Sequence, residues 1–333
     1  MIALWDTKGS EVVKALGAER RSAGGVASGL ALTLIAIVDE GRVREAETAA
    51  ATAAAMHPCR LIVVVRGRTP ATGGANGESR LDAEIVVGGR LGPAEAVVLH
   101  MYGRLARHAE SVVIPLLAPD VPVVTWWHEE PPERIATDPL GVLAERRITD
   151  VSQAADPLAA LHHRADDYAP GDTDLAWTRT TPWRTLVACA FDPPTAPVTA
   201  VRVTAAPGDP TAALLRGWLC VRLGLRPAAV DAPNGMGGAI AAVSMRLDDG
   251  GEMAIEAHNG VATLRRRGLP DRTMPLLRRQ LGDQLAEELR RLDADQPYAA
   301  ALSAATDVHD LARRSPTRVH IWYDPQPDTT NPQ

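Results

Sequence analysis

The sequence predicts an α/β fold: an N-terminal domain with a mostly parallel sheet that contains a β-α-β unit, followed by a smaller α+β domain whose antiparallel sheet is covered by helices. Two continuous apolar runs, 30–39 and 60–67, are typical of strands buried on both faces. In the second half, short strand-like segments alternate with turn residues, as in antiparallel sheets. The length of 333 residues exceeds what one typical core supports, which favours two domains.

The N-terminal domain begins with the β-α-β unit. An alanine-rich segment at 44–57 lies between the two buried runs and predicts a helix. A crossover of this kind is right-handed and joins parallel strands. After a loop rich in Gly, Thr and Asn at 67–79, further strands are expected at 81–89, at 94–103 and at the end of 111–127. Four or five strands should therefore precede residue 127.

Three helices are predicted by one start signal, an Asp or Thr that can cap the first turn, followed by proline at the first helical position. The signal occurs at Asp156-Pro157, Thr181-Pro182 and Asp209-Pro210. In the third of these helices, one face carries Leu214, Trp218, Val221 and Leu225. The charged, proline-rich stretch 128–139 predicts a loop.

The proline-rich stretch 192–197 is the expected boundary between the domains, because proline stiffens the chain and removes hydrogen-bond donors. The N-terminal domain then comprises residues 1–192 and the C-terminal domain residues 193–302. Residues 303–333 are charged and proline-rich, and we expect them to form a disordered tail.

The C-terminal domain should contain an antiparallel sheet and a covering helix. Four strands are predicted, at 196–206, 237–249, 252–258 and 261–268. The segment 275–293 has a stripe of leucines at helical spacing, and we expect this stripe to cover the sheet. Glu287 is expected to pair with Arg291 on the same helix.

The composition excludes several classes of protein function. With 35 Lys plus Arg against 41 Asp plus Glu, the formal charge is −6, which excludes an electrostatic nucleic-acid binder. No apolar run of about 18 residues lacks charge, and Asp6 and Lys8 come too early for a signal-peptide core. We therefore expect a cytoplasmic protein without a membrane partner. The three cysteines, Cys59, Cys189 and Cys220, have neither disulfide nor zinc spacing, so reduced thiols are expected.

The spacings that cofactor, metal and nucleophile sites require do not occur. The glycine cluster 24–29 precedes the first buried strand, whereas a dinucleotide fingerprint places glycines between strand and helix. The adjacent His162 and His163 point about 100° apart on a helix and cannot share a metal. We expect no cofactor, no metal and no catalytic residue. The alternative, a hydrolase using Cys59 and His57, predicts rapid alkylation of Cys59 at neutral pH.

Tryptophan and arginine are concentrated in a few segments, although only 4% of residues are aromatic. Trp126 and Trp127 end a strand, where neighbouring side chains point to opposite faces, so both are buried only if both faces are covered or a partner covers one. Residues 168–184 combine three aromatic side chains with Arg179 and Arg184, a composition typical of interface hot spots. One alternative is that they are core tryptophans with ion-paired arginines. Another is a pocket for a phosphosugar or NADP, with the two arginines clamping phosphate.

A family resemblance is carried by six blocks: HPCRLIVVVRG, SRLDAEIVVGG, SVVIPLLAPDVPVVTWW, DPLGVLAERRITD, YAPGDTDLAWTRTTPWR and LPDRTMPLLRRQLGDQLAEELRRLD. In this order they resemble the OpcA family, the glucose-6-phosphate dehydrogenase assembly proteins of actinobacteria and cyanobacteria. The resemblance runs from near Ala3 to about Leu302. Its most specific blocks are GDTDLAWTRTTPWR and VPVVTWW.

The resemblance implies a non-enzymatic bacterial protein that binds the NADP-dependent dehydrogenase of the oxidative pentose phosphate pathway. Family members favour the active oligomer of glucose-6-phosphate dehydrogenase, so the expected role is assembly factor and allosteric activator, with self-association left open. An activator must bind the active form better than the inactive one, since equal affinity shifts no population. From residue type and motif specificity, the expected partner-binding residues are Trp126, Trp127, Asp172, Asp174, Trp177, Arg179 and Trp183, with Arg146 and Arg147 as rim charges.

Overall fold

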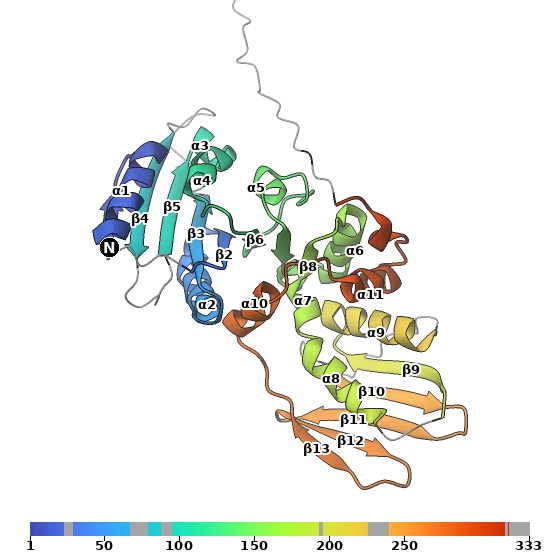
Figure 1. The fold of residues 1–333 in the computed structure, drawn as a ribbon. Coiled ribbons are helices and arrows are strands. Elements are labelled where there is room, and N and C mark those ends of the chain that lie inside the picture. The colour runs from blue at the N-terminus through green and yellow to red at the C-terminus, as the bar shows by residue number, and fades with distance from the viewer. Residues whose placement is uncertain are drawn as a thin grey trace, which may run out of the picture.

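Two sheets organise the chain. The computed structural model describes residues 1–22, 29–66, 79–87, 95–192, 196–225, 240–316 and 319. Within this part lie a mixed sheet of eight strands and an antiparallel sheet of five, which Figure 1 shows at opposite ends of the molecule with helices between them. The predicted α/β fold class is confirmed. Most of the glycine cluster and of the Gly-rich loop lies outside the described residues.

The first sheet has the strand order β1-β4-β5-β3-β2-β6-β7-β8. Its strands are β1 (Ile2–Leu4), β2 (Leu32–Val38), β3 (Cys59–Arg66), β4 (Arg80–Val87), β5 (Glu95–Tyr102), β6 (Val123–Trp127), β7 (Arg146–Thr149) and β8 (Asp172–Asp174). From β5 to β8 all neighbours are parallel, whereas the β1–β4 and β4–β5 pairs are antiparallel. The predicted crossover is confirmed, because α2 (Val43–Met56) joins the parallel neighbours β2 and β3.

Three short strands lie at the edges of this sheet, and of these the sequence pattern indicated only β7, as a short strand after a short helix within 141–150. Four or five strands were expected before residue 127, and the described residues contain six there, β1 to β6. β1 has only three residues, too few for a periodic pattern. β7 and β8 add the opposite edge, and their polar sequences RRIT and DTD lack the apolar run of a buried strand.

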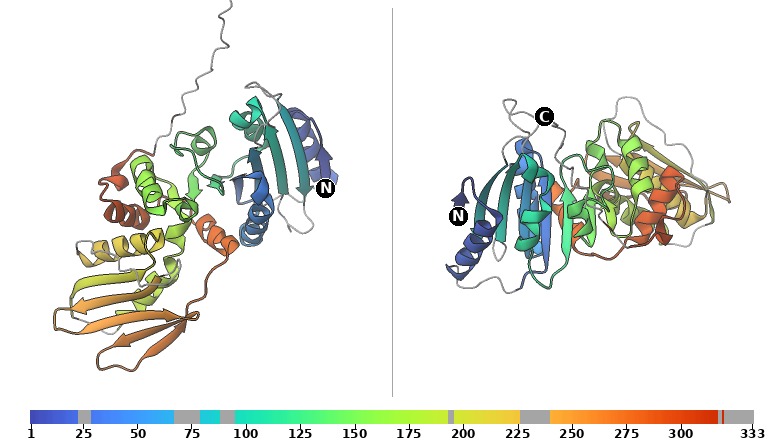
Figure 2. Two further views of the ribbon diagram at one scale, coloured as in Figure 1. Left: turned by 180° about the vertical axis from the view of Figure 1, so that it is seen from behind. Right: turned by 90° about the horizontal axis from the view of Figure 1, so that it is seen from above.

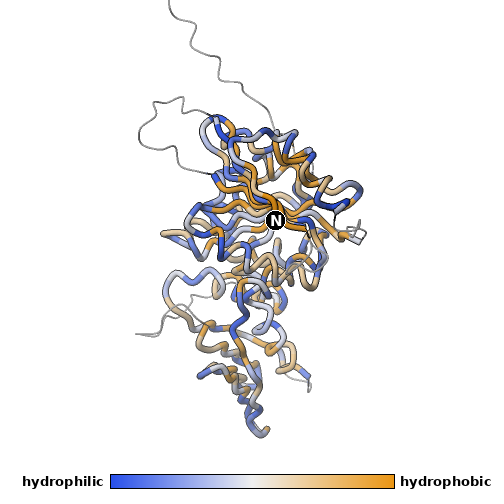
Figure 3. The backbone as a smooth tube through the Cα atoms, turned by 90° about the vertical axis from the view of Figure 1, so that its left-hand side faces the viewer, coloured by the Kyte–Doolittle hydropathy of each residue, from blue (hydrophilic) through white to orange (hydrophobic). Residues whose placement is uncertain are grey.

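Helices cover both faces of the first sheet. One face packs against α1 (Gly9–Ser22), α3 (Arg104–Arg107), α4 (Glu110–Val113) and α5 (Pro139–Val142), and the other against α2 and α10 (Leu281–Leu289). The strands between these layers are the most hydrophobic part of the chain in Figure 3. Trp126 and Trp127 contribute to opposite faces and are 0% and 1% exposed. The chain itself therefore buries both tryptophans.

The second sheet has the order β13-β12-β11-β10-β9, and all its neighbours are antiparallel. Its strands are β9 (Val198–Ala205), β10 (Ile240–Leu247), β11 (Glu252–His258), β12 (Val261–Arg266) and β13 (Arg272–Pro275). The four predicted strands are present, and β13 is an additional short edge strand. The helices α8 (Thr181–Ala190) and α9 (Pro210–Leu223) pack on one face. Asn259 and Gly260 form the turn between β11 and β12 with positive φ, at 48° and 76°.

The predicted helix starts are confirmed at α6 (Pro157–Asp167), α8 and α9. The carboxylate of Asp156 accepts from the backbone N–H of Ala159 at 3.0 Å, and that of Asp209 accepts from Thr211 at 2.8 Å. Both carboxylates thus cap the first turn of a helix, as the sequence pattern predicts.

The predicted helix over 275–293 is shorter, and it covers a different surface. α10 spans only Leu281–Leu289, and Leu285 and Leu289 pack against α2 in the core of the first sheet rather than on the second. Figure 2 shows α10 lying beside α2, away from the antiparallel sheet. Gly282 permits this approach, because a Cβ there would lie 2.5 Å from the Cβ of Thr52. The preceding residues 276–280 form an extended connector from β13.

Order extends beyond the predicted end of the second domain. α11 (Gln296–Thr306) packs against α9, and a 3₁₀ turn, η5 (Leu311–Arg313), buries Leu311. Arg314 donates to the carbonyl oxygens of Ala165 and Tyr168 at 3.0 Å each, which fastens this segment to the end of α6. The stretch 303–316 is therefore part of the fold, which corrects the prediction of a disordered tail from 303. No helix in the described residues is long and apolar enough to cross a membrane.

Candidate functional site

Apart from Trp126 and Trp127 in β6, the residues singled out from the sequence lie on the path that the chain takes from β7 to α8, between the two sheets. β7 and β8 form an edge of the first sheet, α7 (Leu175–Thr178) follows directly, and α8 packs on the second sheet. α10 and α11 come from the C-terminal part of the chain and pack beside this path. The expected boundary at 192 stays a prediction, since the chain passes between the two cores both before and after it.

Arg147 and Asp172 form a buried ion pair across β7 and β8. The Arg147 side chain is 0% exposed, and its Nη2 also donates to the carbonyl oxygen of Pro170 at 2.8 Å. Burial raises the pKa of Asp172, and the Arg147 charge opposes that shift. The turn before β8 requires glycine: Gly171 has a φ of 99°, and a Cβ there would lie 2.3 Å from the carbonyl oxygen of Glu145.

A second ion pair joins Arg179 to Asp150. Nη1 of Arg179 donates to Oδ1 of Asp150 at 2.8 Å and Nη2 donates to Oδ2, a bidentate arrangement. Burial raises the pKa of Asp150, but the hydrogen bonds from Arg179 and Ser152 outweigh burial and leave that pKa lowered. Asp174 is fully buried nearby and accepts from the Thr149 hydroxyl at 2.6 Å. Burial and the charge of Asp150 raise the pKa of Asp174 to about 6.

Hydrogen bonds tie α10 and α11 to this path. Glu288 accepts from Nε of Arg146 at 3.2 Å and from the Thr178 hydroxyl at 2.6 Å. The Thr181 hydroxyl donates to Glu287 at 2.8 Å, and the indole N–H of Trp177 donates to Asp295 at 2.8 Å. We call these residues the interdomain network: Arg146, Trp177, Thr178, Thr181, Glu287, Glu288 and Asp295.

Trp177 is the aromatic centre of this network. The Arg184 guanidinium lies 3.9 Å from the centroid of the Trp177 ring, a cation–π arrangement, and the ring of Tyr298 is 5.9 Å away. Asp295, which accepts from the indole, also caps α11 by accepting from the backbone N–H of Tyr298 at 2.9 Å. Burial lowers the pKa of Arg184. Trp177 therefore orients α11 as well as filling the core.

The predicted partner-binding residues are almost all inside the fold. Buried side chains are those of Trp126, Trp127, Arg146, Arg147, Asp172, Asp174, Trp177 and Trp183. Arg179 is the exception, with 24% of its side chain exposed. Their environment is the one that the alternative interpretation predicted, with tryptophans in the core and arginines in ion pairs. Their contact with a partner stays a prediction, and the buried ones would act on such a surface only through their neighbours.

The sequence prediction missed the acidic residues of the site. Asp150, Glu287, Glu288 and Asp295 pair with the predicted arginines, threonine and tryptophan. Glu287 was expected to pair with Arg291, whereas in the structure Arg279 forms the ion pair with Glu287. Glu288 is buried in α10 beside the apolar residues, a placement that the apolar stripe of the sequence does not indicate.

Two alternatives from the sequence are not supported by the geometry. Arg179 faces a cavity between α9 and the connector, whereas Arg184 faces a different cavity beside α8 and α11. The two arginines therefore do not form one phosphate clamp. Cys59 is buried, and burial raises the pKa of its thiol to about 12, the opposite of what a nucleophile needs. None of Cys59, Cys189 and Cys220 forms a disulfide.

Titratable side chains gather at the carboxyl ends of β2 and β6, where open α/β sheets commonly bind ligands. Nε2 of His128 lies 3.3 Å from a carboxylate oxygen of Glu45, and burial lowers the pKa of His128. Burial raises the pKa of Glu129 to about 7, although Arg66 opposes that shift. In the described part of the chain, no group of three or more His, Cys, Asp or Glu side chains could hold a metal ion.

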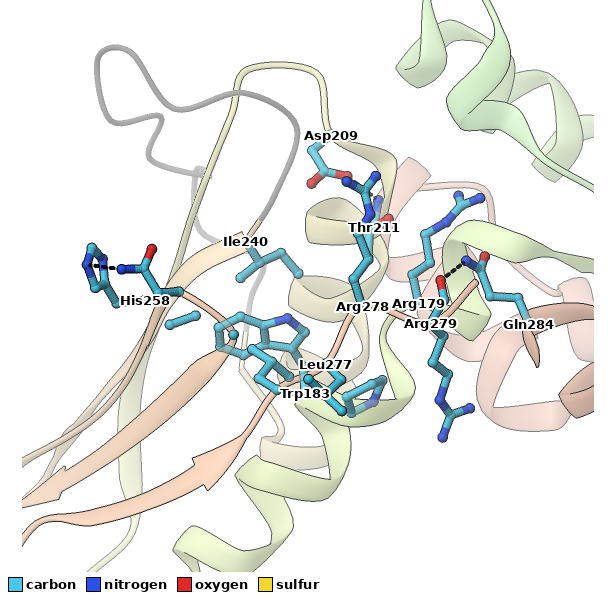
Figure 4. Close-up of a pocket in the computed structure, with 15 residues that line it drawn as sticks. Arg179, Trp183, Asp209, Thr211, Ile240, His258, Leu277, Arg278, Arg279 and Gln284 are labelled. Carbon is cyan, nitrogen blue, oxygen red and sulfur yellow. Dashed lines mark hydrogen bonds between the residues drawn. The ribbon is translucent and has the colours of Figure 1, made fainter. Parts of the chain in front are cut away.

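A half-open cavity of about 300 Å³ lies beside the connector. Figure 4 shows its two chemically different sides: Trp183 and Ile240 are on one, and the guanidinium groups of Arg179, Arg278 and Arg279 are on the other. Such a mixture of apolar wall and few polar groups is typical of binding pockets. The sequence pattern around 276–280 did not reveal it, because those residues were expected to be helical.

These features define a two-domain α/β protein whose arginine and tryptophan side chains are built into the joint between its domains. Two family models match the chain: the glucose-6-phosphate dehydrogenase subunit N-terminal domain over residues 50–166, and the corresponding C-terminal domain over residues 170–302. The chain belongs to this family, the OpcA glucose-6-phosphate dehydrogenase assembly proteins. No curated protein matched the chain. The family resemblance seen in the sequence is thereby confirmed.

Proposed function

We propose that this protein is a non-enzymatic assembly factor that binds glucose-6-phosphate dehydrogenase and raises its activity by favouring the active oligomer. One observation carries the proposal. Both family models are named for a subunit of this dehydrogenase, and they follow each other along residues 50–302 in the order of the two halves of the chain. The dehydrogenase of the oxidative pentose phosphate pathway is therefore the proposed partner.

The joint between the domains supports a binding role. The interdomain network holds the two sheets in one relative orientation through buried ion pairs and hydrogen bonds. A surface held rigid before binding loses little conformational entropy when a partner docks. A rigid surface can also fit one conformation of the partner better than another, and this difference in affinity is what shifts an oligomer equilibrium.

The experiment is an activity assay of the host's glucose-6-phosphate dehydrogenase with and without this protein, run beside light scattering of the same mixtures. We expect a higher rate together with a larger complex. A folded protein that changes neither the rate nor the mass would contradict the proposal. Calorimetry with glucose 6-phosphate and with NADP would then test the alternative of a metabolite-binding regulatory protein.

A further inference from the structure

The connector between β13 and α10 exposes apolar side chains beside the cavity. Leu277 is 75% exposed and lies between the cavity and a neighbouring groove of about 670 Å³. The groove is also lined by Met56, which is 55% exposed, and by Pro182 and Pro275. Single exposed apolar residues are common, but a group of them around a hollow is typical of an interaction site. We call Met56, Pro182, Pro275 and Leu277 the connector patch.

Arginines surround the connector patch. Arg278, Arg279 and Arg290 line the groove, against the carboxylates of Asp283 and Glu287. Arg279 is neutralised by its ion pair with Glu287. Arg278 and Arg290 form no ion pair with the described residues and are exposed. Because Asp283 is also exposed, the three arginines and two carboxylates of the groove leave a net charge of +1, although the whole chain carries a formal charge of −6.

We propose that the connector patch and the adjoining cavity bind an acidic segment of the dehydrogenase, with one apolar side chain of that segment entering the cavity beside Trp183. This inference rests on the proposed function and adds the place and the chemistry of the contact. The apolar wall of the cavity accepts the side chain, and Arg278 and Arg290 attract the flanking carboxylates (Figure 4). A well-packed anchor in a pocket with charged surroundings is the usual form of an interface hot spot.

The connector also relates this contact to the buried residues of the site. Trp183 forms part of the cavity wall, and Arg179 lines the cavity while held by Asp150. Glu287 belongs to the interdomain network and also fixes Arg279 at the cavity. Residues of the segment 168–184 thus lie behind the docking site. Trp183 forms part of the cavity wall, and most of the charged side chains of the segment face the interior of the protein.

The test compares two patch variants with two matched controls. Leu277→Asp changes an exposed residue of the connector patch, and Arg278→Glu changes an exposed arginine beside it. Leu269→Asp and Arg267→Glu make the same changes in the exposed turn between β12 and β13, at the end of β13 away from the connector. We expect each patch variant to weaken binding to the dehydrogenase by at least about tenfold in Kd, and each control to change it less than about twofold.

The outcomes separate this inference from the proposed function. If the wild type does not bind the dehydrogenase, the proposed function fails. If the wild type binds and the patch variants bind equally well, or if the controls weaken binding as much, the docking site is wrong. Circular dichroism checks that each variant is folded, and Arg278→Glu carries the test if Leu277→Asp is not.

A photo-crosslinking residue at position 277 identifies the occupant directly. In the complex, we expect the crosslink to reach a dehydrogenase peptide with a net negative charge and an apolar residue at the crosslinked site. Rising salt should weaken the complex, because the flanking charges are exposed. A crosslink to a basic peptide, or none in a complex that has formed, would overturn the assignment.

Discussion

Two neighbouring buried carboxylates have opposite pKa shifts because their hydrogen-bond donors differ. Asp150 accepts hydrogen bonds from the charged guanidinium of Arg179, and this charge stabilises the anionic form of Asp150 against burial. Asp174 receives only neutral donors, among them the Thr149 hydroxyl and the backbone N–H of Val151 at 3.0 Å. These hydrogen bonds offset burial and the negative charge of Asp150 only in part, so the pKa of Asp174 rises to about 6.

This difference predicts a pH-dependent stability at Asp174. Its carboxyl binds a proton more tightly in the folded chain, with a pKa of about 6, than in an unfolded chain at about 3.9. The resulting stabilisation is complete below the unfolded pKa and is lost as pH rises through about 6. We therefore expect the wild type to lose stability relative to Asp174→Asn between pH 4 and pH 7. Shifted groups that do not interact with Asp174 cancel in this comparison.

Urea unfolding of both proteins at pH 4, 5, 6 and 7 measures the difference. Asp248→Asn, which makes the same change in an exposed turn, is the control. Asp174→Asn loses an acceptor for a backbone N–H, so it should be less stable at pH 4. Parallel pH curves for the wild type and Asp174→Asn would contradict the raised pKa.

At the scale of elements, local signals predicted where helices begin, but not which surface a helix covers. The proline and capping patterns of α6, α8 and α9 are contained in a few adjacent residues. The structure confirms a helix start at each pattern, with a side-chain cap from Asp156 at α6 and from Asp209 at α9 but none at α8. The leucine stripe of α10 predicted an apolar face correctly. Its partner α2 lies more than two hundred residues earlier in the chain, and its alanine-rich surface fits α10 closely. Such a contact depends on the complementary shape of two distant segments, which a single sequence does not display.

The α2–α10 contact predicts a specific sensitivity at Gly282. A Cβ added there would lie 2.5 Å from Thr52 Cβ and 3.0 Å from the carbonyl oxygen of Ala49, so the helices would have to separate. We expect Gly282→Ala to lower the free energy of unfolding by about 1–3 kcal/mol. Gly41→Ala is the control, since a Cβ there meets nothing within 4 Å. Equal free energies of unfolding for Gly282→Ala and the wild type would show that α10 does not pack closely on α2.

At the scale of the whole molecule, the C-terminal part of the chain packs against elements that come much earlier in the sequence. Its C-terminal segment returns from the second sheet to complete the core of the first, and α11 then packs on α9. The sequence predicted two domains and the tryptophan and arginine residues of the joint. It did not predict that these residues face inward, because burial of Arg146 depends on Glu288, which lies 142 residues later. A charged residue is predicted to lie at the surface as long as the residue that pairs with it is unknown.

This closure predicts that the two sheets unfold together. Glu288→Ala leaves the Arg146 guanidinium buried without its carboxylate, which costs about 3–5 kcal/mol, and it also removes the acceptor of the Thr178 hydroxyl. We expect one calorimetric transition for the wild type and two for Glu288→Ala, because the variant loosens the joint while leaving both sheets intact. Glu256→Ala, which breaks the exposed Arg265–Glu256 pair on the second sheet, should keep one transition and cost under about 1 kcal/mol.

Hydrogen exchange then assigns the transitions: the amides of β2 and β3 should open together with those of β10 and β11 in the wild type and separately in Glu288→Ala. Two transitions in the wild type would mean that the interdomain network does not couple the sheets, and that the connector patch is not held rigid for docking.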